Sequence, residues 1–161
     1  MKIYIGSDHS GYEAKEKLKA YFLELGYEIE DKGAFQYHKD DDYPDFITPV
    51  AEAVAKDSEN RGIILGGSGQ GEAMCANRVH GARAAVFYGE VLPQGPVDIE
   101  GHKSSDPFEM VILERKHNDA NILSLSARFL SIDEMKFAVE LFLKTEFSGE
   151  ERHIRRIKKL N

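Results

Sequence analysis

The order of apolar and polar residues predicts alternating strands and helices from the start of the chain. Residues 2–7 (KIYIGS) form an apolar run typical of a short strand, and the polar segment SDHSG follows as a loop. Apolar residues then recur at helical spacing from residue 14 to 25, and Gly26 is suited to end that helix. The first unit of the fold is therefore a strand followed by a helix.

The same alternation continues to the end of the chain. Residues 27–31 alternate apolar and acidic as a second strand, and a polar, turn-rich stretch through residue 42 leads to a helix that opens near Pro44. Ile63, Ile64 and Leu65 form an apolar run that ends in glycines, as a buried parallel strand does. Further along we expect a helix over 71–77, strands over 84–88 and 122–126, and an amphipathic helix behind a capping box formed by Ser131 and Glu134.

This alternation predicts an α/β fold with a doubly wound parallel sheet of five strands and helices on both faces. The 161 residues, 42% of them hydrophobic, are enough for a single domain over 1–161. Residues 89–110 interrupt the pattern with several glycines and prolines, so we expect a long loop that is functional or mobile. A basic extension over 149–161 follows the last helix.

Composition and charge restrict the partners and the location. A formal charge of −7 argues against nucleic acid or an anionic membrane as a partner, since both require a basic face. The sequence has no apolar run of about 18 residues and begins directly on a strand, so we expect a soluble cytoplasmic protein. The single cysteine, Cys75, excludes an internal disulfide and is interpreted as a buried, inert thiol.

The last ten residues are crowded with cations, which has two interpretations. They form a solvated helix end, where cations suit the helix dipole, or they form an anion-binding site. The cations are Arg152, His153, Arg155, Arg156, Lys158 and Lys159.

A glycine-rich loop over Gly66–Glu72 (GGSGQGE) follows the third predicted strand, where ligands bind in open α/β sheets. It does not fit the dinucleotide fingerprint or the phosphate loop of nucleotide hydrolases, because Glu72 stands where a glycine or a lysine is required. It is not a nucleophile elbow around Ser68, because Gln70 takes the place of the second glycine.

Two interpretations of this loop remain. Its backbone N–H groups converge on an anion beside a carboxylate, the parts needed to remove a proton from a carbon next to a carbonyl. Alternatively, it is a tight turn in which Glu72 only interacts with the helix dipole. Two other polar groups favour the first: Asp8 and His9 after the first strand, and Arg115–Asn121 before the last. Three polar clusters at strand ends of one sheet indicate a site. His38, His80, His102 and His153 show no metal-like spacing.

The chain resembles the B-type ribose-5-phosphate isomerase family, which includes allose- and galactose-6-phosphate isomerases. The resemblance extends over nearly the whole length and implies a Rossmann-like fold, with active sites shared across a homodimer interface and a tetramer as a further option. It is carried by Gly6–Gly11, Asp42–Asp45, Gly66–Glu72 with Ala76–Arg78, His117–Asn121, and Arg152, His153 and Arg156.

The resemblance also implies roles for individual residues. Asp8, His9, Gly67, Gly69, Gly71 and Asn118 would bind the substrate, a phosphorylated pentose, and the glycines with Ser68 would hold the enediolate. His117 would be the acid that helps to open the sugar ring. Arg128, Arg152 and Arg156 would bind the phosphate, partly across the dimer, since a guanidinium can grip two phosphate oxygens. No metal or organic cofactor is expected.

Two departures from the family pattern matter. Many members have a cysteine as the base at the position of Gly66, whereas here Glu72 stands six residues on, as in a second branch with GGSGxGE, so we expect Glu72 to be the base. The stretch from Gly89 to Pro107 is longer than expected in the family. The predicted reaction interconverts ribose 5-phosphate and ribulose 5-phosphate, in the pentose phosphate pathway. The alternatives are a six-carbon sugar phosphate isomerase, a non-catalytic sugar-phosphate-binding protein and a nucleotide-binding module.

Overall fold

The computed structural model describes residues 1–160. Within them, five parallel strands form one sheet in the order β2-β1-β3-β5-β4, which confirms the predicted sheet. The strands are β1 (Ile3–Ser7), β2 (Ile29–Asp31), β3 (Arg61–Gly66), β4 (Ala84–Phe87) and β5 (Ile122–Ser126).

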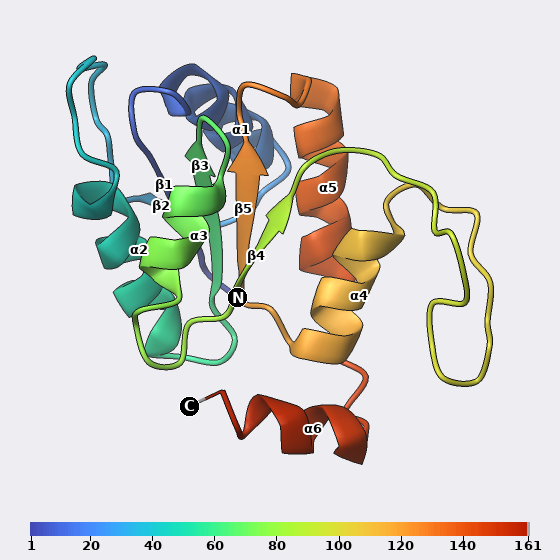
Figure 1. Cartoon of the computed structure of the whole chain (residues 1–161). Helices are drawn as coiled ribbons and strands as arrows, with labels where there is room; N and C mark the ends of the chain where they lie inside the picture. The colour runs from blue at the N-terminus through green and yellow to red at the C-terminus, as the bar shows by residue number, and fades with distance from the viewer. Residues whose placement is uncertain (161) are drawn as a thin grey trace.

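Helices cover both faces of this sheet, as the alternation predicts (Figure 1). One apolar core joins the sheet to α1 (Tyr12–Glu24), α4 (Glu109–Asn118) and α5 (Ile132–Lys144), and a second core joins it to α2 (Pro44–Ala55) and α3 (Gln70–Ala76). The sheet is thus a doubly wound layer between two helical layers. The last helix, α6 (Glu151–Ile157), lies beyond the amino ends of the strands and contacts α4 (Figure 1).

The predicted starts and stops of helices are confirmed where local side chains decide them. Ser131 Oγ accepts from the backbone N–H of Glu134 at 3.2 Å, and the Glu134 carboxylate accepts from the N–H of Ser131 at 2.8 Å, so the capping box forms. Pro44 opens α2, and Gly26 follows α1 with a φ of 85°, a left-handed conformation that glycine adopts without strain.

Some sequence expectations need correction. The second strand begins at Ile29 rather than residue 27, and the long loop after β4 ends at Phe108 because α4 begins at Glu109. Cys75 is only half-buried, at the margin of the core between α2 and α3, with its Sγ 3.4 Å from Thr48 Oγ1 on α2. The basic extension contains α6, and its final residue, 161, lies outside the described residues. Among residues 1–160, no helix has the length and apolarity needed to cross a membrane.

Helix α4 carries a buried acidic side chain, Glu114, which is 8% exposed. Its Oε2 has no hydrogen-bond partner within residues 1–160, and burial raises the pKa of this carboxyl to about 8. A carboxyl with a raised pKa in the folded state favours the fold when protonated. Its contribution is therefore complete below pH 4.5, the ordinary value, and is lost as the pH rises through 8.

We expect the Glu114→Gln variant to lose less stability than the parent protein between pH 4.5 and pH 9. The shift of the Glu114 pKa predicts a difference of roughly 3–5 kcal/mol in that pH dependence, because each pKa unit corresponds to about 1.4 kcal/mol. Urea unfolding at a series of pH values measures it. The matched control is Glu24→Gln, an exposed residue at the end of α1, which should leave the pH dependence unchanged. Parallel curves for the parent and Glu114→Gln would show that Glu114 is ionised throughout.

Candidate active site

The strand order creates a ligand position between β1 and β3. From these two neighbours the chain continues in opposite directions, from β1 to β2 on one side and from β3 to β4, at the far edge beyond β5, on the other. In open α/β sheets such a switch point forms a crevice at the carboxyl ends of the strands. Asp8 and His9 directly follow β1 and the glycine loop directly follows β3, so the fold brings these two predicted groups together.

Glu72 is in the first turn of α3, and its carboxylate reaches back to the end of β3. A Cβ at position 66 would overlap that carboxylate, so the carboxylate fills the space above the Gly66 backbone where another residue would have its side chain. Gly69, with a φ of 75°, makes the left-handed turn that starts α3 and directs Glu72 inward. The side chain is 4% exposed. The sequence suggested a position beside the loop, and the structure places the carboxylate inside it.

The environment of Glu72 makes its carboxylate a stronger base than an exposed one. Burial raises the pKa of Glu72, and the nearby negative charge of Asp8 raises it further. A hydrogen bond from its own backbone N–H acts in the opposite direction, and burial is the larger effect. A helix N-terminus makes a nearby carboxylate a weaker base, and for Glu72 desolvation offsets that effect.

Two buried serines of β5 hold the backbone of the glycine loop by hydrogen bonds. Ser126 Oγ donates to the Ser68 carbonyl at 2.7 Å, and Ser124 Oγ donates to the Gly69 carbonyl at 2.7 Å. The Ser68 side chain remains half-exposed on the other side of the loop. Gly71 packs against the ring of Tyr43, where a Cβ would lie 3.1 Å from Tyr43 Cζ. These contacts hold the loop rigidly against β5 and the start of α2.

Asp8, His9 and Arg128 complete this half of the site. Asp8 is 7% exposed, and its Oδ1 accepts the N–H groups of Ser10 and Gly11 at 2.9 and 3.2 Å, which fixes the turn into α1. Arg128 follows β5, lies over Gly67 and donates to Ser10 Oγ at 3.1 Å. Its guanidinium is exposed, so a phosphate can reach it beside the glycine loop.

His117, Asn118, Arg152 and Arg156 lie elsewhere, which corrects the expectation that all three polar clusters gather at one site of the sheet. Helix α4 runs back against the strand direction, so His117 and Asn118 in its last turn lie at the amino ends of the strands, next to α6 (Figure 1). The length of β5 separates the two edges by roughly 15 Å, at about 3.3 Å per residue. One chain therefore carries two groups of predicted site residues at opposite edges, which we call the two half-sites.

The second half-site is organised around His153, for which no separate role is predicted from the sequence. The His117 and His153 rings stack with centroids 4.3 Å apart, and His153 is 4% exposed. Burial lowers the pKa of His153, as do His117 and Arg152 beside it. Arg152 Nε donates to His153 Nε2 at 3.2 Å, and Arg152 also pairs with Glu150 at 2.8 Å and Glu100 at 3.4 Å. Arg156 is exposed on α6.

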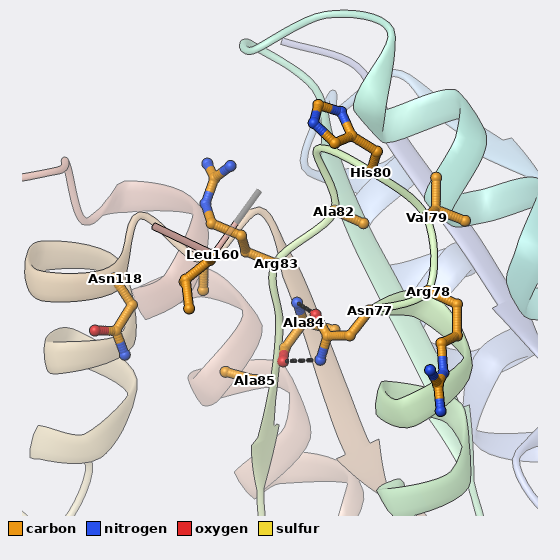
Figure 2. A pocket seen from close by; sticks show the side chains of 11 residues that line it. Asn77, Arg78, Val79, His80, Ala82, Arg83, Ala84, Ala85, Asn118 and Leu160 are labelled. Carbon is orange, nitrogen blue, oxygen red and sulfur yellow. Dashed lines mark hydrogen bonds between the residues drawn. The ribbon is translucent and has the colours of Figure 1, made fainter. Parts of the chain in front are cut away.

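Asn118 also lines a cavity of about 770 Å³ at this amino edge. Figure 2 shows the residues that line it, with Asn118 at the left, Arg83 near the centre and His80 and Arg78 at the right. Asn77 is held by two hydrogen bonds with the Ala84 backbone, at 2.8 and 2.9 Å. The cavity lining thus combines two arginines and a histidine with a mostly apolar surface, and Glu72 is not part of it.

In the described part of the chain there are two groups of carboxylate and imidazole side chains that could hold a metal. In each group, three potential ligand atoms lie within 4.8 Å of one another. One group is Asp8, His9 and Asp41, and the other, on the loop after β4, is Asp98, Glu100 and His102. In the first, Asp8 and Asp41 already accept backbone N–H bonds. The expectation that no metal is needed stays a prediction.

Comparisons with known proteins agree with this arrangement. A family model described as Ribose/Galactose Isomerase matches residues 3–92 and 105–160, and the unmatched residues 93–104 fall in the long loop after β4. Ribose-5-phosphate isomerase B of Mycolicibacterium paratuberculosis is 36% identical over 157 residues, covering 98% of this chain and 87% of the relative.

Solved structures of similar proteins have the same fold. Ribose-5-phosphate isomerase B of Mycoplasma genitalium, solved with bound ribulose-5-phosphate, has a TM-score of 0.84 and 34% identity, covering 99% of this chain and 93% of that one. The Clostridium thermocellum protein of the same name has a TM-score of 0.82 and 40% identity, covering 99% and 95%.

Proposed function

The chain belongs to the ribose/galactose isomerase family and is an aldose–ketose isomerase, and from this premise we propose how its own residues interconvert ribose 5-phosphate and ribulose 5-phosphate. The observation that carries the proposal is the buried Glu72 carboxylate in the space above Gly66, inside the glycine loop. A partly desolvated carboxylate beside small residues suits the removal of a proton from a sugar carbon.

Proton transfer by Glu72 accounts for the reaction. After the ring opens, the carboxylate takes the proton from C2, the C2–H electron pair forms the C1–C2 double bond, and the C1 carbonyl oxygen becomes an oxyanion. Ser68 and the N–H groups at the start of α3 stabilise this enediolate. Glu72 then returns its proton to C1, while the O2 hydroxyl gives up its proton, C2 becomes the carbonyl and O1 becomes a hydroxyl. The overall change is one proton moved from C2 to C1 and one from O2 to O1.

The other residues bind and prepare the substrate. Asp8 and His9 contact the sugar, the backbone of Gly67, Gly69 and Gly71 helps to hold the enediolate, and Arg128 binds the phosphate from the side of the glycine loop. His117 is the acid that opens the ring, with Asn118 beside it, and Arg152 and Arg156 complete the phosphate site. No cofactor takes part in this scheme.

Because the two half-sites lie at opposite edges of one chain, we propose a homodimer in which each site combines halves from both chains. A two-fold axis that sets the strands of two chains antiparallel places the carboxyl edge of one sheet beside the amino edge of the other. The surface formed by α3 and the free edge of β4 lies between the half-sites and exposes Met74 and Tyr88, at 68% and 46%. These apolar side chains favour this surface as the interface. A tetramer and a cytoplasmic location stay predictions.

Incubation of the purified protein with ribose 5-phosphate and, separately, with allose 6-phosphate tests the proposed substrate. We expect ketose formation from ribose 5-phosphate with a kcat/KM at least about tenfold higher, a difference that corresponds to roughly 1.4 kcal/mol of transition-state binding. The relative with bound ribulose-5-phosphate supports the pentose. Faster turnover of allose 6-phosphate would assign a six-carbon substrate, and no turnover of either would indicate a non-catalytic binding protein.

A further inference from the structure

Asp41 is a buried carboxylate beside the site for which neither the fold nor the reaction has so far supplied a role. It belongs to the acidic run Asp40–Asp42 in the loop before α2, which the sequence predicts only as a polar turn. Asp40 is exposed, with 72% of its side chain accessible, whereas the Asp41 side chain is 7% exposed and turns inward to His9. A residue 32 positions away thus contacts the loop after β1.

A single oxygen of Asp41 makes two hydrogen bonds to His9. Asp41 Oδ1 accepts the backbone N–H of His9 at 3.0 Å and lies 2.7 Å from the ring nitrogen Nδ1. A carboxylate oxygen accepts and does not donate, so the short contact requires a hydrogen on Nδ1. In the neutral ring the other nitrogen, Nε2, is then an acceptor.

The other groups around His9 cannot set this tautomer. Asp8 Oδ2 is 3.8 Å from Nδ1, beyond hydrogen-bond distance, and Asp8 Oδ1 is occupied by two backbone N–H groups. Tyr37 meets the ring edge-on at 6.5 Å between centroids. His9, Ser10 and Tyr37 line a cavity of about 350 Å³, and Ser10 is the residue that Arg128 contacts. The ring thus contacts Asp41 through Nδ1 and belongs to the same loop as Ser10, the residue that the proposed phosphate ligand Arg128 contacts.

A carboxylate at position 41 also buries a charged oxygen, which a purely structural contact with His9 would not require. Asp41 Oδ2 is buried and finds no hydrogen-bond partner within residues 1–160. An asparagine could accept the His9 N–H equally well without burying charge, but its NH₂ group could also turn toward Nδ1 and favour the other tautomer. The carboxylate is the group that allows one tautomer.

We propose that Asp41 is a positioning residue that fixes His9 as the Nδ1–H tautomer, so that Nε2 accepts a hydrogen bond from a hydroxyl of the open-chain sugar phosphate. The proposal rests on the proposed function, in which His9 contacts the sugar. A fixed acceptor orients the polyhydroxy chain relative to Glu72 before the C2 proton is removed.

Histidine ring ¹⁵N spectra test the tautomer without any turnover. In protein labelled at the ring nitrogens, with the His9 signals assigned by their loss in His9→Gln, we expect the parent protein to show Nδ1–H and an unprotonated Nε2 once the ring is neutral. In Asp41→Asn we expect a substantial share of the Nε2–H tautomer. The matched control is Asp40→Asn, which makes the same charge change on the same loop and should leave the spectrum unchanged.

Kinetics of the same variants test the consequence. We expect kcat/KM of Asp41→Asn to fall about 3- to 10-fold, as for the loss of one hydrogen bond between uncharged groups, with Asp40→Asn at the parent value. An Nε2–H tautomer in the parent protein would overturn the proposal, and so would a changed tautomer with unchanged kcat/KM. If the parent protein does not isomerise ribose 5-phosphate, the proposed function fails, while the spectra still decide the tautomer.

Discussion

Replacing Glu72 by glutamine is expected to lower kcat for ribose 5-phosphate by about 10²- to 10⁴-fold with little change in substrate affinity, as the loss of a general base does. The amide has nearly the same shape, so the space above Gly66 remains filled. In the parent protein, kcat/KM should fall as the pH drops through the pKa of Glu72, which burial raises above the ordinary value for a glutamate, because only the ionised form accepts a proton. Initial rates over a pH series measure both effects.

Two further variants show whether the position of the carboxylate matters. Gly66→Ala adds a Cβ that overlaps the Glu72 carboxylate, and should therefore also be nearly inactive while Glu72 is intact. Cys75→Ala is the control, because that thiol contacts Thr48 on α2 and not the glycine loop, and it should keep most activity. An active Glu72→Gln with an inactive Cys75→Ala would transfer the role of the base to the thiol.

Removing both Arg152 and Arg156 is expected to raise the KM for ribose 5-phosphate by about 100-fold or more. Each charge-assisted contact to phosphate contributes roughly 1.5–3 kcal/mol, and the two contributions act together. Arg155→Ala is the control, since Arg155 is exposed on the same helix and has no proposed contact with substrate. Circular dichroism of the double variant should show that α6 and the core are retained.

Mixing inactive chains tests whether the arginines act on the partner's site. A Glu72→Gln chain is mixed with an Arg152→Ala/Arg156→Ala chain under conditions that allow subunit exchange. A shared site predicts that each mixed dimer regains one intact site and carries both defects in the other, so about a quarter of all sites become active at equal mixing. No recovery despite demonstrated exchange would contradict the shared site and place the arginines with the Glu72 of their own chain.

The sequence by itself determined the elements and most of the first half-site. Strands and helices are encoded by apolar spacing over a few residues, so β3 and the helix behind Ser131 could be predicted from local pattern alone. A chain that alternates strands and helices also brings the ends of neighbouring parallel strands together. Hence Asp8 and Glu72, which are distant in sequence, were expected near one another, and the fold places them at adjacent strands.

The tertiary structure decided what depends on direction and on contacts between distant segments. His117 lies at the opposite edge from Glu72 because α4 runs back along the sheet, and its ring is positioned by His153 from a helix that the sequence describes only as a basic end. Asp41 and its neighbour Asp40 have the same local pattern, and only the packing of their loop against His9 selects the buried one. Local periodicity carries no information on such pairings, because their free energy comes from contacts that form only when the chain is folded.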